Sequence, residues 1–181
     1  MIIMEASTTK TEYKVKIIVA GDGGVGKTSL LNRYVTDTFM EVMKMTIGTG
    51  FFTKVIETED STVSLQLWDF GGEKRFRFIL PSYCKGAHGA ILAFDMNDFT
   101  TLINLDEWLQ IIRENTKNPT TFLVGTKVDI AGVLDENFIQ EYLQKNQLAK
   151  FIPTSAKSGE NVDRLFEELT HDVLVQETLD T

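Results

Sequence analysis

The sequence is poor in cysteine, in proline and in positive charge, and each shortage excludes a class of protein. Cys84 is the one cysteine among 181 residues, so a disulfide framework is excluded and this thiol is expected in the core. Three prolines and the lack of Gly- or Pro-rich tracts give no sign of a linker between domains. A net charge of −8 disfavours nucleic acid or an anionic membrane as the main partner.

Targeting and membrane signals are also missing. The opening MIIMEASTTK has neither the basic start nor the apolar run of a signal peptide, and no apolar segment approaches the ~20 residues that cross a bilayer. No glycine follows Met1, and the final VQETLDT holds no cysteine for prenylation. We therefore expect a cytoplasmic chain with no lipid anchor of its own, which reaches a membrane only through a partner or through a tail missing from this sequence.

Apolar runs typical of strands alternate with helical periodicity along the chain. A helix is predicted near 26–36, and two others carry apolar stripes further on. The alternation predicts an α/β fold with a doubly wound sheet, whose ligands bind at the carboxyl ends of the strands. The predicted strands are 13–20, 49–58, 61–69, 89–95 and 120–126, with a hairpin turn at Glu59 and Asp60. The stripes are Leu102, Leu105, Leu109 and Ile112, then Val162, Leu165, Phe166, Leu169 and Val173.

A glycine-rich loop follows the first predicted strand. Residues 21–28 read GDGGVGKT and match the pattern G-x-x-x-x-G-K-[ST]. Glycines let successive backbone N–H groups wrap phosphates, and the next helix points its positive end at them. In this pattern the lysine contacts the terminal phosphates and the threonine hydroxyl binds Mg²⁺. The residues expected at the phosphates and the metal are Gly21, Gly23, Gly24, Val25, Gly26, Lys27, Thr28 and Ser29.

Two later segments are suited to reading a guanine base. In VGTKVDI (124–130), an aspartate can accept hydrogen bonds from the ring and amino N–H groups of guanine, and adenine lacks that pair of donors. In PTSAKSG (153–159), the Ala156 N–H can donate to the exocyclic oxygen of guanine while the Ser155 hydroxyl steadies the aspartate. The expected base-binding residues are Thr126, Lys127, Asp129, Ser155, Ala156 and Lys157.

The order of these motifs resembles one known family. The phosphate loop, TIGTGF (46–51), WDFGG (68–72), TKVD and SAK follow one another as in small GTPases of the Ras superfamily, and the strings LQLWD and YCKGA are most similar to the Rab branch. The WDFGGEKRF segment and the lack of a lipidated tail resemble archaeal and bacterial relatives. The resemblance implies a GTPase domain over 12–176 between terminal segments 1–11 and 177–181. It also implies a six-stranded, mostly parallel sheet with one antiparallel edge strand and helices on both faces.

The resemblance further implies the ligands and their contacts. GTP or GDP and Mg²⁺ are the expected cofactors. The Thr46 hydroxyl would join Thr28 at the metal, and Asp69 would hold it through a water. The Gly72 N–H would contact the γ-phosphate, and Phe39 would lie against the base.

The implied activity is that of a switch. A monomer would bind GTP, hydrolyse it slowly and signal through segments 38–50 and 70–82, in membrane trafficking or cytoskeletal regulation. Lys27, Thr46, Gly72 and Glu73 are its expected catalytic residues. Effectors, exchange factors and activating proteins would bind the two segments and a surface of Phe51, Trp68 and Tyr83. The alternative is a scaffold that holds nucleotide permanently and does not cycle.

Four positions depart from the family pattern. Glu73 replaces a glutamine that positions the attacking water, so it acts as an ionised base, as a protonated acid that mimics glutamine, or turns out to solvent. Met43 stands where a tyrosine often closes over the nucleotide, and Thr126 replaces an asparagine without loss of guanine selectivity. Pro81 is expected to end the helix of the second switch segment early.

Overall fold

The computed structural model describes residues 10–41, 44–132 and 135–179. They form a six-stranded sheet with the order β2-β3-β1-β4-β5-β6. Neighbours pair in parallel except β2, which lies antiparallel to β3 at one edge. The predicted fold class, with its one antiparallel edge strand, is therefore confirmed. The strands are β1 (Thr11–Ala20), β2 (Thr49–Glu57), β3 (Ser61–Phe70), β4 (Gly89–Asp95), β5 (Thr120–Thr126) and β6 (Lys150–Pro153).

Helices cover both faces of the sheet because its central strands bury side chains on both sides. Ile17 and Ile18, successive residues of β1, lie in two different core clusters, and both are fully buried. One cluster joins the sheet to α1 and α6, and the other joins it to α2, α3, α4 and α5. The helices are α1 (Lys27–Thr36), η1 (Lys74–Ile79), α2 (Leu80–Cys84), α3 (Thr100–Ile103), α4 (Leu105–Asn115), η2 (Val128–Ile130), α5 (Glu136–Lys145) and α6 (Val162–Leu179).

The predicted core residues take their expected places. Both apolar stripes are buried, and Cys84 is a fully buried core residue of α2. The first stripe spans two elements, because α3 ends at Ile103 and α4 begins at Leu105. Pro81 was expected to end a helix, and this is wrong. It stands in the first turn of α2, where its missing N–H costs no hydrogen bond.

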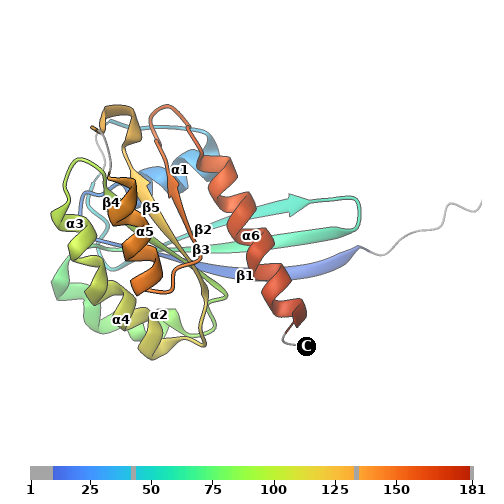
Figure 1. Cartoon of the computed structure of the whole chain (residues 1–181). Helices are drawn as coiled ribbons and strands as arrows, with labels where there is room; N and C mark the ends of the chain where they lie inside the picture. Colours follow the sequence, from blue (N-terminus) through green and yellow to red (C-terminus); the bar gives the residue numbers. More distant parts are fainter. Residues whose placement is uncertain (1–9, 42–43, 133–134, 180–181) are drawn as a thin grey trace, which may run out of the picture.

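The hairpin and the terminal helix set the outline of the molecule. The β2–β3 hairpin, with β1 beside it, extends past the helices in Figure 1, while the carboxyl ends of the parallel strands meet at the opposite end. Helix α6 continues to Leu179. Within the described residues, no helix combines the length and the apolar character needed to span a bilayer.

Candidate functional site

A cavity of about 380 Å³ lies at the carboxyl ends of the strands. Its size falls in the range typical of small-molecule sites. The phosphate loop, the loop before β2, Gly72 and the segments after β5 and β6 all reach it. Its lining consists of Gly23, Gly24, Gly26, Lys27, Thr28, Ser29, Leu30, Phe39, Met40, Glu41, Lys44, Met45, Thr46, Gly72, Thr126, Lys127, Asp129, Ile130, Thr154, Ala156 and Lys157.

Lys27 brings a buried cation to this cavity. It begins α1 and is 5% exposed, and its Nζ donates to the backbone oxygens of Gly21 and Asp22, each at 2.7 Å. Burial lowers the pKa of Lys27 to about 8, against the opposing charges of Asp69 and Asp22. The preceding Gly26 has φ 101°, a conformation that side chains disfavour. The turn therefore delivers an ammonium group whose charge favours an anion in the cavity.

Three oxygen-bearing side chains meet beside Lys27. The Thr28 hydroxyl lies 2.5 Å from Asp69 Oδ2 and 2.8 Å from the Thr46 hydroxyl. The Thr46 hydroxyl is itself 3.2 Å from the same carboxylate oxygen. The three come from α1, the end of β3 and the loop before β2, so the fold and not the local sequence assembles them.

This oxygen cluster fits a magnesium ion. Asp69 is fully buried, and its Oδ1 has no hydrogen-bond partner within the part of the chain that the structure describes. Burial raises the pKa of Asp69, against the two threonine hydrogen bonds and the Lys27 charge. A buried carboxylate oxygen without a partner is costly, and an oxygen-only set of donors is what Mg²⁺ prefers.

Gly72 packs directly against the phosphate loop. A Cβ added to Gly72 would lie 2.0 Å from the backbone nitrogen of Gly23, so no larger residue fits without a backbone shift. Glu73 follows Gly72 but is absent from the described cavity lining. Its carboxylate lies 2.6 Å from the Nε of Arg75, and its side chain is 25% exposed. The structure therefore places Glu73 beside a lining residue in the chain and directs its charge to an arginine.

Most of the predicted base-binding residues line the same cavity, and the part where they lie is called its base end. Lys127 has φ 61°, and its Nζ donates to the Gly24 carbonyl at 2.9 Å and to Asp95 at 2.6 Å. The Thr126 hydroxyl donates to the Val25 carbonyl at 2.5 Å, which ties β5 to the phosphate loop. These bonds hold the two predicted motifs, 21–28 and 126–129, against each other.

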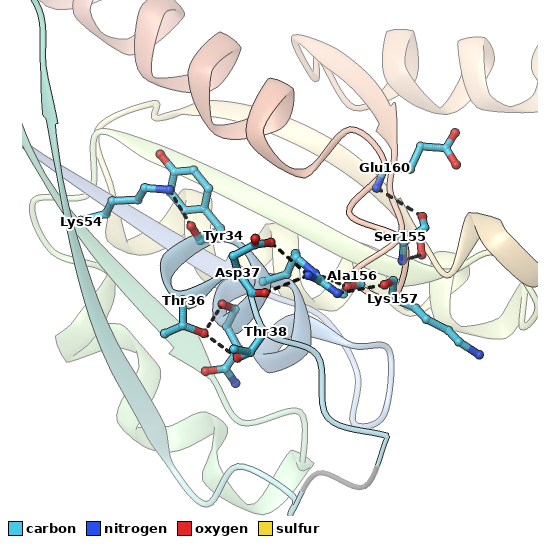
Figure 2. A network of polar contacts seen from close by, with 12 residues as sticks. Tyr34, Thr36, Asp37, Thr38, Lys54, Ser155, Ala156, Lys157 and Glu160 are labelled. Atoms are coloured by element: carbon cyan, nitrogen blue, oxygen red, sulfur yellow. Dashed lines mark hydrogen bonds and ion pairs between the residues drawn. The ribbon is translucent and has the colours of Figure 1, made fainter.

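Asp129 is held by the loop that follows β6. The Ser155 hydroxyl donates to its Oδ1 at 2.6 Å, as the sequence predicts. The same hydroxyl accepts from the Ser158 N–H at 3.1 Å, while the Ser155 N–H donates to the Glu160 carbonyl at 3.1 Å. Figure 2 shows Ser155 and Glu160 near each other in this loop. One carboxylate oxygen of Asp129 is thus engaged, and Asp129 also lines the cavity.

Some predicted residues support the cavity without lining it. Gly21 accepts from Lys27, Ser155 supports Asp129, and Asp69 belongs to the oxygen cluster. The Val25 side chain is a core residue, 1% exposed, and only its backbone faces neighbouring motifs. Met43 lies outside the described residues.

The predicted partner surface is a cluster of three aromatic rings that contact one another at tilted angles. Phe51 and Trp68 face each other across the β2–β3 ladder with centroids 4.8 Å apart, and Tyr83 of α2 lies 5.1 Å from Trp68. Phe51 is 52% exposed. The three residues therefore form one partly exposed aromatic surface that joins the hairpin to α2.

The sequence motifs did not predict two groups of contacts. Asp22 accepts from Asn104 at 2.6 Å, from the indole N–H of Trp108 at 2.9 Å and from Arg77 at 3.4 Å. The Arg77 guanidinium also lies over the Trp108 ring, 4.4 Å from its centroid. Arg33 makes a second network, described below. No spacing signal in a single sequence could find partners 55 to 86 residues apart, since only the fold brings them together.

Comparison with known proteins agrees with this geometry. Residues 16–175 match the sequence model of the Ras family. The Ras-related protein Rab-1A of Dictyostelium discoideum is 39% identical over 164 residues, which cover 89% of this chain and 81% of that protein. The Ras-related protein RIC1 of Oryza sativa subsp. japonica is 37% identical over 168 residues, which cover 90% and 81%.

Proposed function

This chain belongs to the Ras family of small GTPases, and from that premise we propose that it is a guanine-nucleotide switch that hydrolyses GTP slowly. Proteins of this family bind GTP or GDP with Mg²⁺. The observation that carries the proposal is one cavity whose lining includes Lys27, Thr28 and Thr46 together with Asp129. A guanine nucleotide offers phosphate charge to Lys27 and base donors to Asp129, so one ligand can use both groups.

Each group has a role that its surroundings support. Lys27 and the backbone of the phosphate loop bind the phosphates, and Gly72 presents its N–H at the terminal phosphate. Thr28 and Thr46 would ligate Mg²⁺ directly, with Asp69 behind them. The ion, when bound, neutralises the charge that develops on the phosphate oxygens. Asp129, Lys127 and Ala156 bind the base, and Phe39 covers it.

Switching follows from where these contacts originate. Thr46 and Gly72 belong to the segments 38–50 and 70–82, so a terminal phosphate that both contact would order the two segments together. Hydrolysis removes those contacts. Effectors would then distinguish the two states at the aromatic surface of Phe51, Trp68 and Tyr83. Unaided hydrolysis is expected on the order of 10⁻⁴ to 10⁻³ s⁻¹, a figure taken over from the family.

Nucleotide affinity tests the proposal. Protein stripped of nucleotide should bind GTP with Mg²⁺ about 10⁴-fold more tightly than ATP, because adenine leaves the Asp129 carboxylate without donors. Asp129→Ala should lose most of this preference, and Asp60→Ala, a change in the exposed β2–β3 turn, should keep it. Equal affinities of the wild type for ATP and GTP would overturn the proposal.

The position of Glu73 favours a second candidate. With its carboxylate on Arg75 and no glutamine at that place, the protein would hold GTP without cycling and act as a scaffold. Single-turnover assays separate the candidates, since the switch releases phosphate from bound [γ-³²P]GTP and the scaffold retains it. Binding of partners to GTP-loaded and GDP-loaded protein should differ for a switch and coincide for a scaffold.

A further inference from the structure

Arg33 joins three segments at the base end of the cavity. It lies on α1, and its Nε donates to the Ala156 carbonyl at 2.7 Å while Nη2 donates to the Lys157 carbonyl at 2.9 Å. Its Nη1 donates to the Asp37 carbonyl at 2.9 Å and contacts the Asp37 carboxylate at 3.0 Å. Figure 2 shows Asp37, Ala156 and Lys157 drawn together at this point. One guanidinium thus fixes backbone positions more than 100 residues apart.

These bonds have the geometry that only arginine provides. The guanidinium is planar and always charged, and its donors spread in a fixed fork that an ammonium group cannot copy. The side chain is 18% exposed, so water screens its bonds to the two carbonyls only partly. The Asp37 carboxylate is 93% exposed and its ion pair therefore contributes little. The carbonyl bonds are the significant part of the network.

The carbonyl bonds control the direction of one backbone donor. The Ala156 N–H belongs to the peptide plane whose carbonyl is Ser155, and that carbonyl accepts from the Gly159 N–H at 2.8 Å. Arg33 fixes the next two planes through the carbonyls of Ala156 and Lys157. Ala156 is therefore held from both sides, and it lines the cavity. Its N–H cannot turn away while both sets of bonds persist.

The bond to Asp37 connects Arg33 to a second segment of the cavity lining. Asp37 caps the end of α1 with φ 52°, and two residues later Phe39 lines the same cavity. Arg33 thereby ties the segment that bears Phe39 to the loop that bears Ala156. Two segments of the cavity lining are therefore tied to one side chain that does not line the cavity itself.

We propose that Arg33 is a positioning residue for guanine recognition, which aims the Ala156 N–H at the guanine O6 and holds the two lining segments together. The inference rests on the proposed guanine-nucleotide function. It has two consequences. Without Arg33, the protein loses discrimination at O6 in particular, and bound nucleotide dissociates faster.

The experiment compares dissociation rates and affinities of three diphosphates in one protein sample. In 6-thio-GDP, sulfur replaces O6 and accepts hydrogen bonds weakly, while the donors to Asp129 remain. IDP lacks the amino group that donates to Asp129 and keeps O6. Wild type should prefer GDP to each of them by about tenfold. Arg33→Ala should release GDP about tenfold faster, reduce the GDP/6-thio-GDP ratio to about two and retain the GDP/IDP ratio.

Ratios measured within one sample do not depend on the fraction of folded protein. Arg33→Lys keeps the charge and loses the fork, so it should behave like Arg33→Ala in the O6 ratio. Arg164→Ala is the matched control, because Arg164 of α6 pairs only with a residue of its own helix, Glu168 at 2.7 Å, in the contacts that the structure describes. It should match wild type in both ratios.

The outcomes distinguish a failure of the role of Arg33 from a failure of the proposed guanine-nucleotide function. A wild type that binds no guanine nucleotide refutes the proposed function. A wild type that binds GDP well, with both ratios unchanged or equally reduced in Arg33→Ala, refutes the role of Arg33 alone, since a merely structural residue would weaken all three nucleotides together. A wild type indifferent to the O6 substitution also overturns the inference.

Discussion

The Glu73 carboxylate lies 2.6 Å from the Nε of Arg75, only two residues further along the chain. A local ion pair of this kind, with Arg75 68% exposed, is weak and easily exchanged. Glu73 therefore has a partner that holds its charge without locking it there. Its three possible roles now differ by how this pair responds to bound GTP.

Hydrolysis by a Glu73→Gln variant distinguishes these roles. If Glu73 acts as an ionised base, wild-type turnover rises with pH and the variant is slower, because the amide cannot take a proton. If Glu73 acts as a protonated acid, wild-type turnover falls as pH rises and the variant is pH-independent and at least as fast. If Glu73 turns out to solvent or stays on Arg75, both proteins give the same flat profile.

The measurement is single-turnover phosphate release between pH 5.5 and about 8.5, with wild-type nucleotide retention as the control at each pH. Arg75→Ala should make the pH dependence of phosphate release steeper in whichever direction is observed, since it releases the Glu73 carboxylate from its partner. An identical response of wild type and variant at every pH contradicts both catalytic roles.

Gly72→Ala should reduce GTP hydrolysis by about 100-fold, because the new Cβ would lie 2.0 Å from the Gly23 nitrogen and must push the second switch segment away from the phosphate loop. Affinity for GDP should change far less, since this contact concerns the terminal phosphate. Gly132→Ala is the control, as its Cβ would meet none of the described atoms within 4 Å. Equal turnover in both variants would show that the segment tolerates displacement.

Asp22→Ala should lower the free energy of unfolding by about 1–3 kcal/mol, measured in urea with saturating GDP. The loss follows from Trp108, whose side chain is 1% exposed and whose indole N–H would have no acceptor in place of Asp22 Oδ1. Asp60→Ala in the exposed turn should stay within about 0.5 kcal/mol of wild type. Asp22→Asn should recover part of the loss because its amide oxygen still accepts. Equal stability of Asp22→Ala and wild type would contradict this network.

Stability should decline with pH through Cys84. Burial raises the pKa of the thiol to about 11, whereas an unfolded thiol ionises near 8.5. Between these values the unfolded state loses its proton first, so the contribution is complete below about pH 8.5 and falls by up to ~3 kcal/mol towards pH 11. The difference between wild type and Cys84→Ala, followed by urea unfolding across this range, isolates the thiol from lysines that titrate nearby. A pH-independent difference would contradict the assignment.

The elements that the sequence predicted share a physical cause. Runs such as 89–95 and 120–126 are buried on both faces, so their composition alone distinguishes them from surface strands. Motifs close in sequence, such as Lys27 with Thr28, were equally accessible to prediction. Pro81 was misjudged because a proline both ends helices and suits their first turn, and only the backbone decides between the two.

Contacts between distant segments could not be predicted in the same way. Arg33 reads as an ordinary charged position of an amphipathic helix, yet it bonds the Ala156 carbonyl 123 residues away. Asp22 occupies an unspecified position of the phosphate-loop pattern, yet its carboxylate accepts hydrogen bonds from Asn104 and Trp108. Such pairs follow no periodicity or fixed spacing in the sequence, because the folding of the whole sheet brings their segments together.

The β2–β3 ladder has a mechanical consequence. Nine residue pairs lock the two strands in antiparallel register, from Thr49 opposite Phe70 to Glu57 opposite Thr62. Thr46 precedes one end of this ladder and Gly72 follows the other strand at the same end. A slip by one residue would turn every side chain to the wrong face, so neither segment can advance along the strand axis without the other. The hairpin therefore couples the two segments along the strand axis. Each segment can rotate about the end of the hairpin, but neither can shift along the axis independently of the other.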